Sequence, residues 1–152
     1  MYLVDRRLHK MNGNTEMLNF IFQNSEMGVN TIGQIVELTI EPEFKKQLNS
    51  QLAEYEIINK EAKDMLNKHG CEEKGINSFD KIKTYLMINI QTLTDKSASH
   101  ISEMLIIGSN MGVIDAVKNI HKYLEAEKDI VKLMQRLLKF EQENIKQLTE
   151  FL

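Results

Sequence analysis

The chain of 152 residues has no tryptophan, one cysteine, one proline and seven glycines. So little proline and glycine argues against a loop-rich or all-β fold. The lone Cys71 excludes a disulfide within the chain and a multi-cysteine metal site, and it predicts a free thiol in a reducing cytoplasm. The apolar run 104–107 (MLII) is far too short to span a bilayer, and the charged N-terminal segment lacks the apolar stretch of a secretory signal. We therefore expect a cytoplasmic protein with no membrane partner.

An excess of one charge is also missing. The 19 basic and 22 acidic side chains give a formal net charge of −3. A nucleic-acid surface would show a basic excess, so we expect no nucleic-acid partner. The sequence has no glycine-rich phosphate loop and no serine in a nucleophile elbow, and we predict no catalytic residue.

Helical periodicity is what the sequence does contain. Between its turn signals, apolar and small residues recur at alternating steps of four and three, which places them on one stripe of a helix. The stripe in 15–38 comprises Leu18, Phe22, Ser25, Val29, Ile32 and Val36, and the stripe in 43–69 comprises Leu48, Leu52, Tyr55, Asn59, Ala62 and Leu66. No segment alternates with a period of two, so the prediction is a single all-α domain over 1–152.

Turn signals divide the chain into two helical hairpins, 15–38 with 43–69 and 98–122 with 127–152. Residues 1–14 are expected as an N-terminal arm, with Asn14 or Thr15 capping the first helix. Gly70 is expected to end the second helix, and Ser97 or Ser99 to begin the third. The connection 70–97 carries a helical stretch of its own, 82–90, unless 80–122 is one long helix kinked near 94–99. A hairpin, a long crossover and a second hairpin are the connectivity of ferritin-like four-helix bundles.

The second hairpin echoes the first. At an offset of 84, the motif Met-Gly-Val at 27–29 recurs at 111–113, and the stripe of 15–38 maps onto Ile106, Ser109, Val113, Ala116 and Ile120. Two amphipathic hairpins can also resemble each other by chance. In either case these residues are expected to line the bundle.

Several strings resemble the ferritin-like superfamily, and the chain is most similar to a group of small, uncharacterised bacterial members of it. The strings are 23–28 (QNSEMG), 51–55 (QLAEY), 95–104 (DKSASHISEM), 108–112 (GSNMG) and 138–141 (LKFE). The resemblance covers most of the chain beyond Asn14 and implies a four-helix bundle.

The resemblance also implies a di-iron pattern of one Glu on the first and third helices and Glu-x-x-His on the second and fourth. The first helix offers Glu26. Glu56 and Glu141 keep the two carboxylates of the paired motifs, but both histidines are replaced, by Asn59 and Asn144. An amide oxygen is a poor iron ligand beside imidazole, so a standard di-iron oxidase site is not expected.

The third helix has Asn110 where the pattern needs a carboxylate. Its His100 and Glu103 stand three residues apart, a spacing that can hold a metal or form an ordinary helical pair. His9, His69 and His121 are predicted as surface residues. If a metal site persists, it would bind iron through a subset of Glu26, Glu56, His100, Glu103 and Glu141.

Polar residues also lie on the apolar stripes of the second and fourth helices. Tyr55, Asn59 and Asn144 would line a small cavity or form a hydrogen-bonded buried layer that fixes register. Glu141, between Leu137 and Leu148, is the most suggestive carboxylate, the alternative being an edge residue paired with lysine.

The helix 98–122 is apolar on two sides, with Met104, Ile107, Met111 and Ile114 opposite its bundle stripe. Either the segment 80–93 or a second subunit must cover that side. The helix 15–38 repeats the feature with Phe20 and Met27. We expect a homo-oligomer, a dimer through helices 15–38 and 98–122, in which Gly28 and Gly112 permit close approach.

Two functions follow as hypotheses. The first is a non-enzymatic oligomeric interaction, scaffold or coat-type protein with a degenerate di-iron site and no cofactor. The second is a metal-binding protein in iron handling or oxidative-stress defence.

Overall fold

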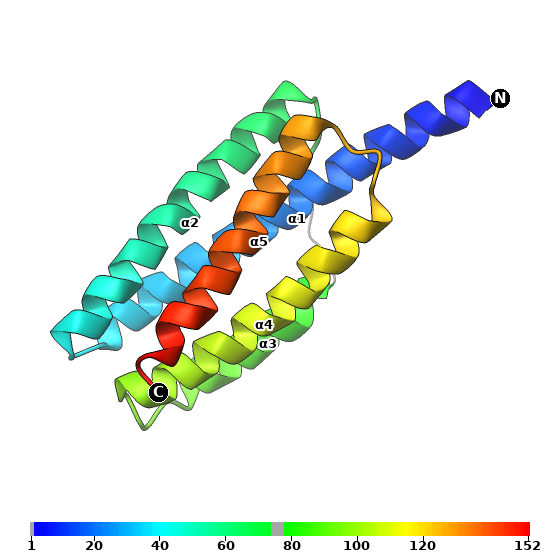
Figure 1. Cartoon of the computed structure of the whole chain (residues 1–152). Coiled ribbons are helices and arrows are strands. Elements are labelled where there is room, and N and C mark those ends of the chain that lie inside the picture. The colour runs from blue at the N-terminus through cyan, green and yellow to red at the C-terminus, as the bar shows by residue number, and fades with distance from the viewer. Residues whose placement is uncertain (1, 74–77) are drawn as a thin grey trace.

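The computed structural model describes residues 2–73 and 78–152, with side chains for 13–73 and 79–152; within these ranges it contains five α-helices and no β-strand (Figure 1). The helices are α1 (Tyr2–Leu38), α2 (Pro42–Lys68), α3 (Ser78–Gln91), α4 (Ala98–Lys122) and α5 (Lys128–Thr149). The predicted all-α class is thus confirmed for the described residues. None of the described helices combines the length and apolarity that crossing a membrane requires.

The helices form two antiparallel hairpins, α1 with α2 and α4 with α5, and α3 packs along α4 and against α1 (Figure 1). The chain reverses direction at every connection, so α2 and α4 run the same way. The segment 70–97 therefore crosses the bundle as α3. The alternative of one kinked helix over 80–122 is wrong, because α3 ends at Gln91 and α4 begins at Ala98.

Local signals explain most helix ends. Pro42 opens α2, where a missing backbone N–H costs nothing. Gly70, directly after the C-cap residue His69, has a φ of 65°, the left-handed conformation expected of a glycine there. The Ser97 hydroxyl caps α4 by accepting a hydrogen bond from the backbone N–H of His100 at 3.2 Å.

The predicted start of the first helix is wrong. α1 begins at Tyr2 and passes without interruption through Gly13 and Asn14. The Asn14 side chain is buried and accepts a hydrogen bond from the backbone N–H of Glu127 at 2.8 Å. Asn14 therefore does not cap its own helix, because its Oδ1 binds a backbone N–H in the connection between α4 and α5.

The middle of α1 is buried on all sides. Every residue from Met17 to Phe22 is buried, and the ring centroids of Phe20 and Phe79 lie 4.9 Å apart. α3 therefore covers the second apolar face of α1 at Phe20. This part of the expected dimer surface lies in the interior of the chain.

The buried face of α4 is rotated from the predicted stripe. Its centre follows Ile101, Leu105, Gly108 and Gly112, whereas Ile106 and Val113 are only half-buried. The physical reason is that α3 covers α4 on one side while α5 and α1 cover it on another. The residues between the two predicted apolar faces therefore lie deepest.

Candidate functional site

A hydrogen-bonded pair from the two hairpins lies at the middle of the bundle. Tyr55 of α2 donates from its hydroxyl to Oε1 of Glu141 on α5, with 2.5 Å between the oxygens. Both side chains are buried, Tyr55 at 5% and Glu141 at 4% exposure. Glu141 was predicted on the buried face of its helix, and its partner is this phenol instead of a lysine.

Gly28 makes the space for Tyr55. A Cβ at position 28 would lie 2.5 Å from the Cδ1 and Cε1 atoms of the Tyr55 ring. Gly112 likewise lies under Asn24, whose Nδ2 would be 3.1 Å from an added Cβ. Both glycines therefore permit close approach inside the chain, and the expectation that they serve a dimer contact is wrong.

Burial controls the protonation of the pair. Removal from water raises the pKa of Glu141 to about 7, although the hydroxyls of Tyr55 and Ser109 act in the opposite direction. Burial, followed by the adjacent Glu141 carboxyl, also raises the pKa of Tyr55 well above its ordinary value. Glu141 is therefore a buried carboxyl that changes charge near neutral pH.

A cavity of about 40 Å³ lies beside the pair, large enough for roughly two or three water molecules. Three of its lining side chains are buried and have an atom without a hydrogen-bond partner: Oδ1 of Asn24, Nε2 of Gln51 and Oε2 of Glu141. A groove of about 320 Å³ between α1 and α3 shares Met27, Thr31 and Leu86 with this lining. The lining of the cavity therefore combines apolar side chains with buried polar atoms that have no hydrogen-bond partner.

The two asparagines that replace the expected histidines have different environments. Asn59 donates its amide to the carbonyl oxygen of Phe22 at 3.2 Å and to the hydroxyl of Ser25 at 3.1 Å. Asn144 is buried, and its Nδ2 has no partner. The predicted hydrogen-bonded layer is therefore formed at Asn59, while Asn144 is left with an unused donor.

The proposed metal ligands do not converge. Glu26, Glu56 and Glu103 are exposed, His100 is half-buried near the start of α4, and only Glu141 points into the bundle. Glu103 lies close enough to Tyr85 to raise the pKa of that phenol, after the larger effect of burial. No three of these five residues bring ligand atoms together in the described structure.

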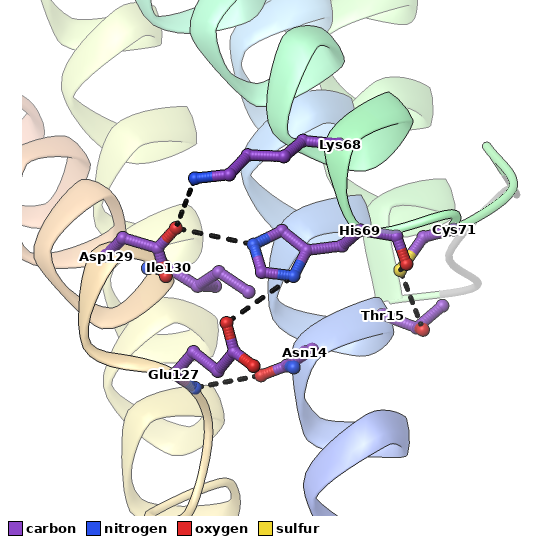
Figure 2. A network of polar contacts seen from close by, with 8 residues as sticks. All are labelled: Asn14, Thr15, Lys68, His69, Cys71, Glu127, Asp129 and Ile130. Atoms are coloured by element: carbon purple, nitrogen blue, oxygen red, sulfur yellow. Dashed lines mark hydrogen bonds and ion pairs between the residues drawn. The ribbon is translucent and has the colours of Figure 1, made fainter.

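A second cluster joins the end of α2 to the start of α5 (Figure 2). His69 lies between two carboxylates, with Nε2 at 3.3 Å from Oδ2 of Asp129 and Nδ1 at 3.5 Å from Oε2 of Glu127. One ligand atom from each of the three residues lies within 4.8 Å of the other two. We call His69, Glu127 and Asp129 the helix-end cluster.

The helix-end cluster is partly shielded from solvent. The side chain of His69 is 13% exposed, against 41% for Glu127 and 36% for Asp129. Burial raises the pKa of Asp129, but hydrogen bonds from His69 and from the backbone N–H of Ile130 outweigh it and hold the pKa below the ordinary value. Asp129 is therefore ionised at neutral pH.

The prediction of His69 as a surface residue is wrong, because its side chain is only 13% exposed. The one local signal was Glu127 and Asp129, two acidic residues at the start of a helix. Nothing in the sequence says that His69 lies beside them, because the contact forms only when α2 and α5 pack against each other.

Comparison with known proteins yields no relative. No family model, no curated protein and no solved structure matches this chain.

Proposed function

We propose that the protein is a ferritin-like bundle that has lost its di-iron centre and acts as a non-enzymatic, cytoplasmic, homo-oligomeric scaffold or coat-type protein. The proposal is supported by the two hairpins and by a crossover that lets α2 and α4 run in the same direction. The observation that carries it is the environment of Glu141. This buried carboxyl faces a phenol and amide side chains, and Glu26 and Glu56 are exposed to solvent.

Iron loading tests the loss of the metal centre. The full chain is incubated with Fe²⁺ in air, desalted and submitted to elemental analysis beside Glu141→Gln and Glu141→Ala. We expect no iron that depends on Glu141, because a pair of iron ions needs several converging carboxylates. Stoichiometric iron that disappears in Glu141→Ala would contradict the proposal.

An exposed apolar stripe on α4 supports self-association. Ile107 and Ile114 lie seven residues apart on one face, with 41% and 56% exposure, and Met87 and Ile88 of α3 are also exposed. An apolar stripe of this kind complements itself across a two-fold axis, so the expected partner is a second copy of the chain.

Sedimentation equilibrium of the double variant Ile107→Glu/Ile114→Glu tests this surface. We expect the wild type to sediment as an oligomer and the double variant as a monomer with unchanged helix content. Ile57→Glu, an exposed isoleucine on α2, is the matched control and should leave the oligomer intact. A monomeric wild type, or an oligomeric double variant, would exclude this interface.

The second candidate is iron binding in iron handling or oxidative-stress defence. The observation in its favour is that Oε2 of Glu141 lies in a cavity without a hydrogen-bond partner. The iron-loading experiment separates this function from the first.

A further inference from the structure

We propose that the helix-end cluster, His69 with Glu127 and Asp129, is a binding site for a divalent transition-metal ion of the Zn²⁺ type. It lies at the end of the bundle where α2 meets α5 (Figure 2) and uses none of the residues around Glu141.

The ligand set fits this class of ion. One imidazole and two carboxylates are the donors of many zinc and non-haem iron sites, and an imidazole favours such ions over Ca²⁺ and Mg²⁺. Bonds of about 2.0–2.1 Å in a tetrahedron place neighbouring ligand atoms about 3.3 Å apart. The separation of 3.3 Å between Nε2 of His69 and Oδ2 of Asp129 matches that value, whereas Glu127 lies at the other ring nitrogen, Nδ1.

Both the main chain and the ring of His69 have partners before an ion arrives. His69 is the C-cap residue of α2, its backbone N–H donates to the carbonyl oxygen of Met65 at 2.9 Å, and Nε2 of its ring lies 3.3 Å from Oδ2 of Asp129. Only one ring nitrogen can bind a given ion, so one carboxylate must turn toward it. Glu127 is the more exposed of the two and has the longer side chain, so it can close the site while Asp129 stays at Nε2.

The local field favours a cation. The two carboxylates supply two formal negative charges, whereas the partial negative charge at the carbonyl end of α2 is balanced by the partial positive charge at the N-terminus of α5. Lys68 partly compensates this negative charge, because its Nζ lies 3.8 Å from Oδ2 of Asp129. The Lys68 side chain is 72% exposed. A divalent ion would displace Lys68 into solvent at little cost.

Isothermal titration calorimetry of the full, untagged chain with Zn²⁺ tests the site. We expect saturation at one ion per chain, and a Co²⁺ adduct with the visible absorption of nitrogen and oxygen ligands. His69→Gln and Asp129→Asn should each weaken binding at least about tenfold. Lys68→Ala, which removes the competing cation, should strengthen it by up to about fivefold.

His121→Gln is the matched control, since His121 is an exposed histidine at the end of α4 outside the cluster, and it should bind Zn²⁺ like the wild type. Circular dichroism without metal establishes that each variant is folded. Absence of saturable Zn²⁺ binding, or binding that survives both His69→Gln and Asp129→Asn, overturns the proposal. Iron held at this cluster would survive Glu141→Ala, so the site and the loss of the di-iron centre are tested separately.

Discussion

Gly28 of α1 and Tyr55 of α2 fit against each other so closely that no side chain can be added between them. A Cβ on Gly28 would lie 2.5 Å from two atoms of the Tyr55 ring, which is itself held by Glu141 and by edge-on contact with Phe140 at 4.8 Å. The ring cannot give way without breaking the polar pair.

Gly28→Ala is therefore expected to destabilise the protein. The overlap should cost about 1–3 kcal/mol, partly offset by the roughly 1 kcal/mol that alanine gains over glycine in a helix. Gly33→Ala is the control, because no atom lies within 4 Å of its added Cβ, and it should stabilise by about 0.5–1 kcal/mol. Urea unfolding measures both, and equal changes for the two variants would disprove the packing role of Gly28.

Stability should fall as the pH rises through the range in which Glu141 ionises. The folded chain holds its proton up to about pH 7, whereas an unfolded glutamate releases it near 4.5. The folded state thus binds more protons between these values, so its stability decreases with increasing pH by a total of about 3 kcal/mol.

Glu141→Gln removes this titration and keeps an acceptor for Tyr55. The free energy of unfolding is measured from pH 4.5 to 8 for the wild type, Glu141→Gln and the control Glu143→Gln, an exposed neighbour on α5. The difference in unfolding free energy between wild type and Glu141→Gln should change across this pH range. The difference between wild type and Glu143→Gln should stay constant. Parallel curves for wild type and Glu141→Gln would refute the titration of Glu141.

Tyr55→Phe should destabilise the fold by about 1–3 kcal/mol at neutral pH, because Oε1 of Glu141 loses its phenol donor while Oε2 already lacks a hydrogen-bond partner. It should also raise the pKa of Glu141 further, since the Tyr55 hydroxyl now lowers it. The same unfolding series reports this as a loss of stability that extends to higher pH. A variant with wild-type stability and pH dependence would argue that the hydrogen bond contributes nothing.

Asn14→Ala should cost about 0.5–2 kcal/mol, the range of a lost helix cap, because the N–H of Glu127 loses its acceptor. Asn49→Ala makes the same exchange at an exposed helical position on α2 and corrects for helix propensity. Thermal unfolding at fixed pH compares them. A Tm of Asn14→Ala at or above that of Asn49→Ala would contradict the cap.

Periodicity predicted the parts of the fold that depend on one helix at a time. The stripes of 15–38 and 43–69 contain Leu18, Ile32, Leu48 and Leu66, all of which are buried. The rotated face of α4 was not predictable in this way, because it depends on where α3 lies.

The start of α1 shows the same limit. Gly13 and Asn14 favour a break in an isolated chain, but Asn14 finds its partner 113 residues away at Glu127. The local preference of these residues for a helix break is overridden by this tertiary hydrogen bond, which forms only when the two hairpins pack together.

For the sites, sequence position was enough to identify Glu141 as a buried carboxylate on an apolar stripe. It could not supply partners: Glu26 and Glu56 face solvent, and the neighbours of His69 come from the start of α5. Sequence alone can place a side chain on one face of its helix, but the residues that contact it from other helices depend on how the helices pack.

The ring of Phe151, close to the C-terminus, lies against Phe44 at the start of α2, with 5.0 Å between centroids, whereas His69 follows the last turn of that helix. At 1.5 Å per residue, the length of α2 separates these two ends by about 40 Å. A fluorophore or affinity tag fused after Leu152 would therefore report on the opposite pole of the molecule, and a polyhistidine tag there could not complete the coordination of an ion at His69 in the same chain.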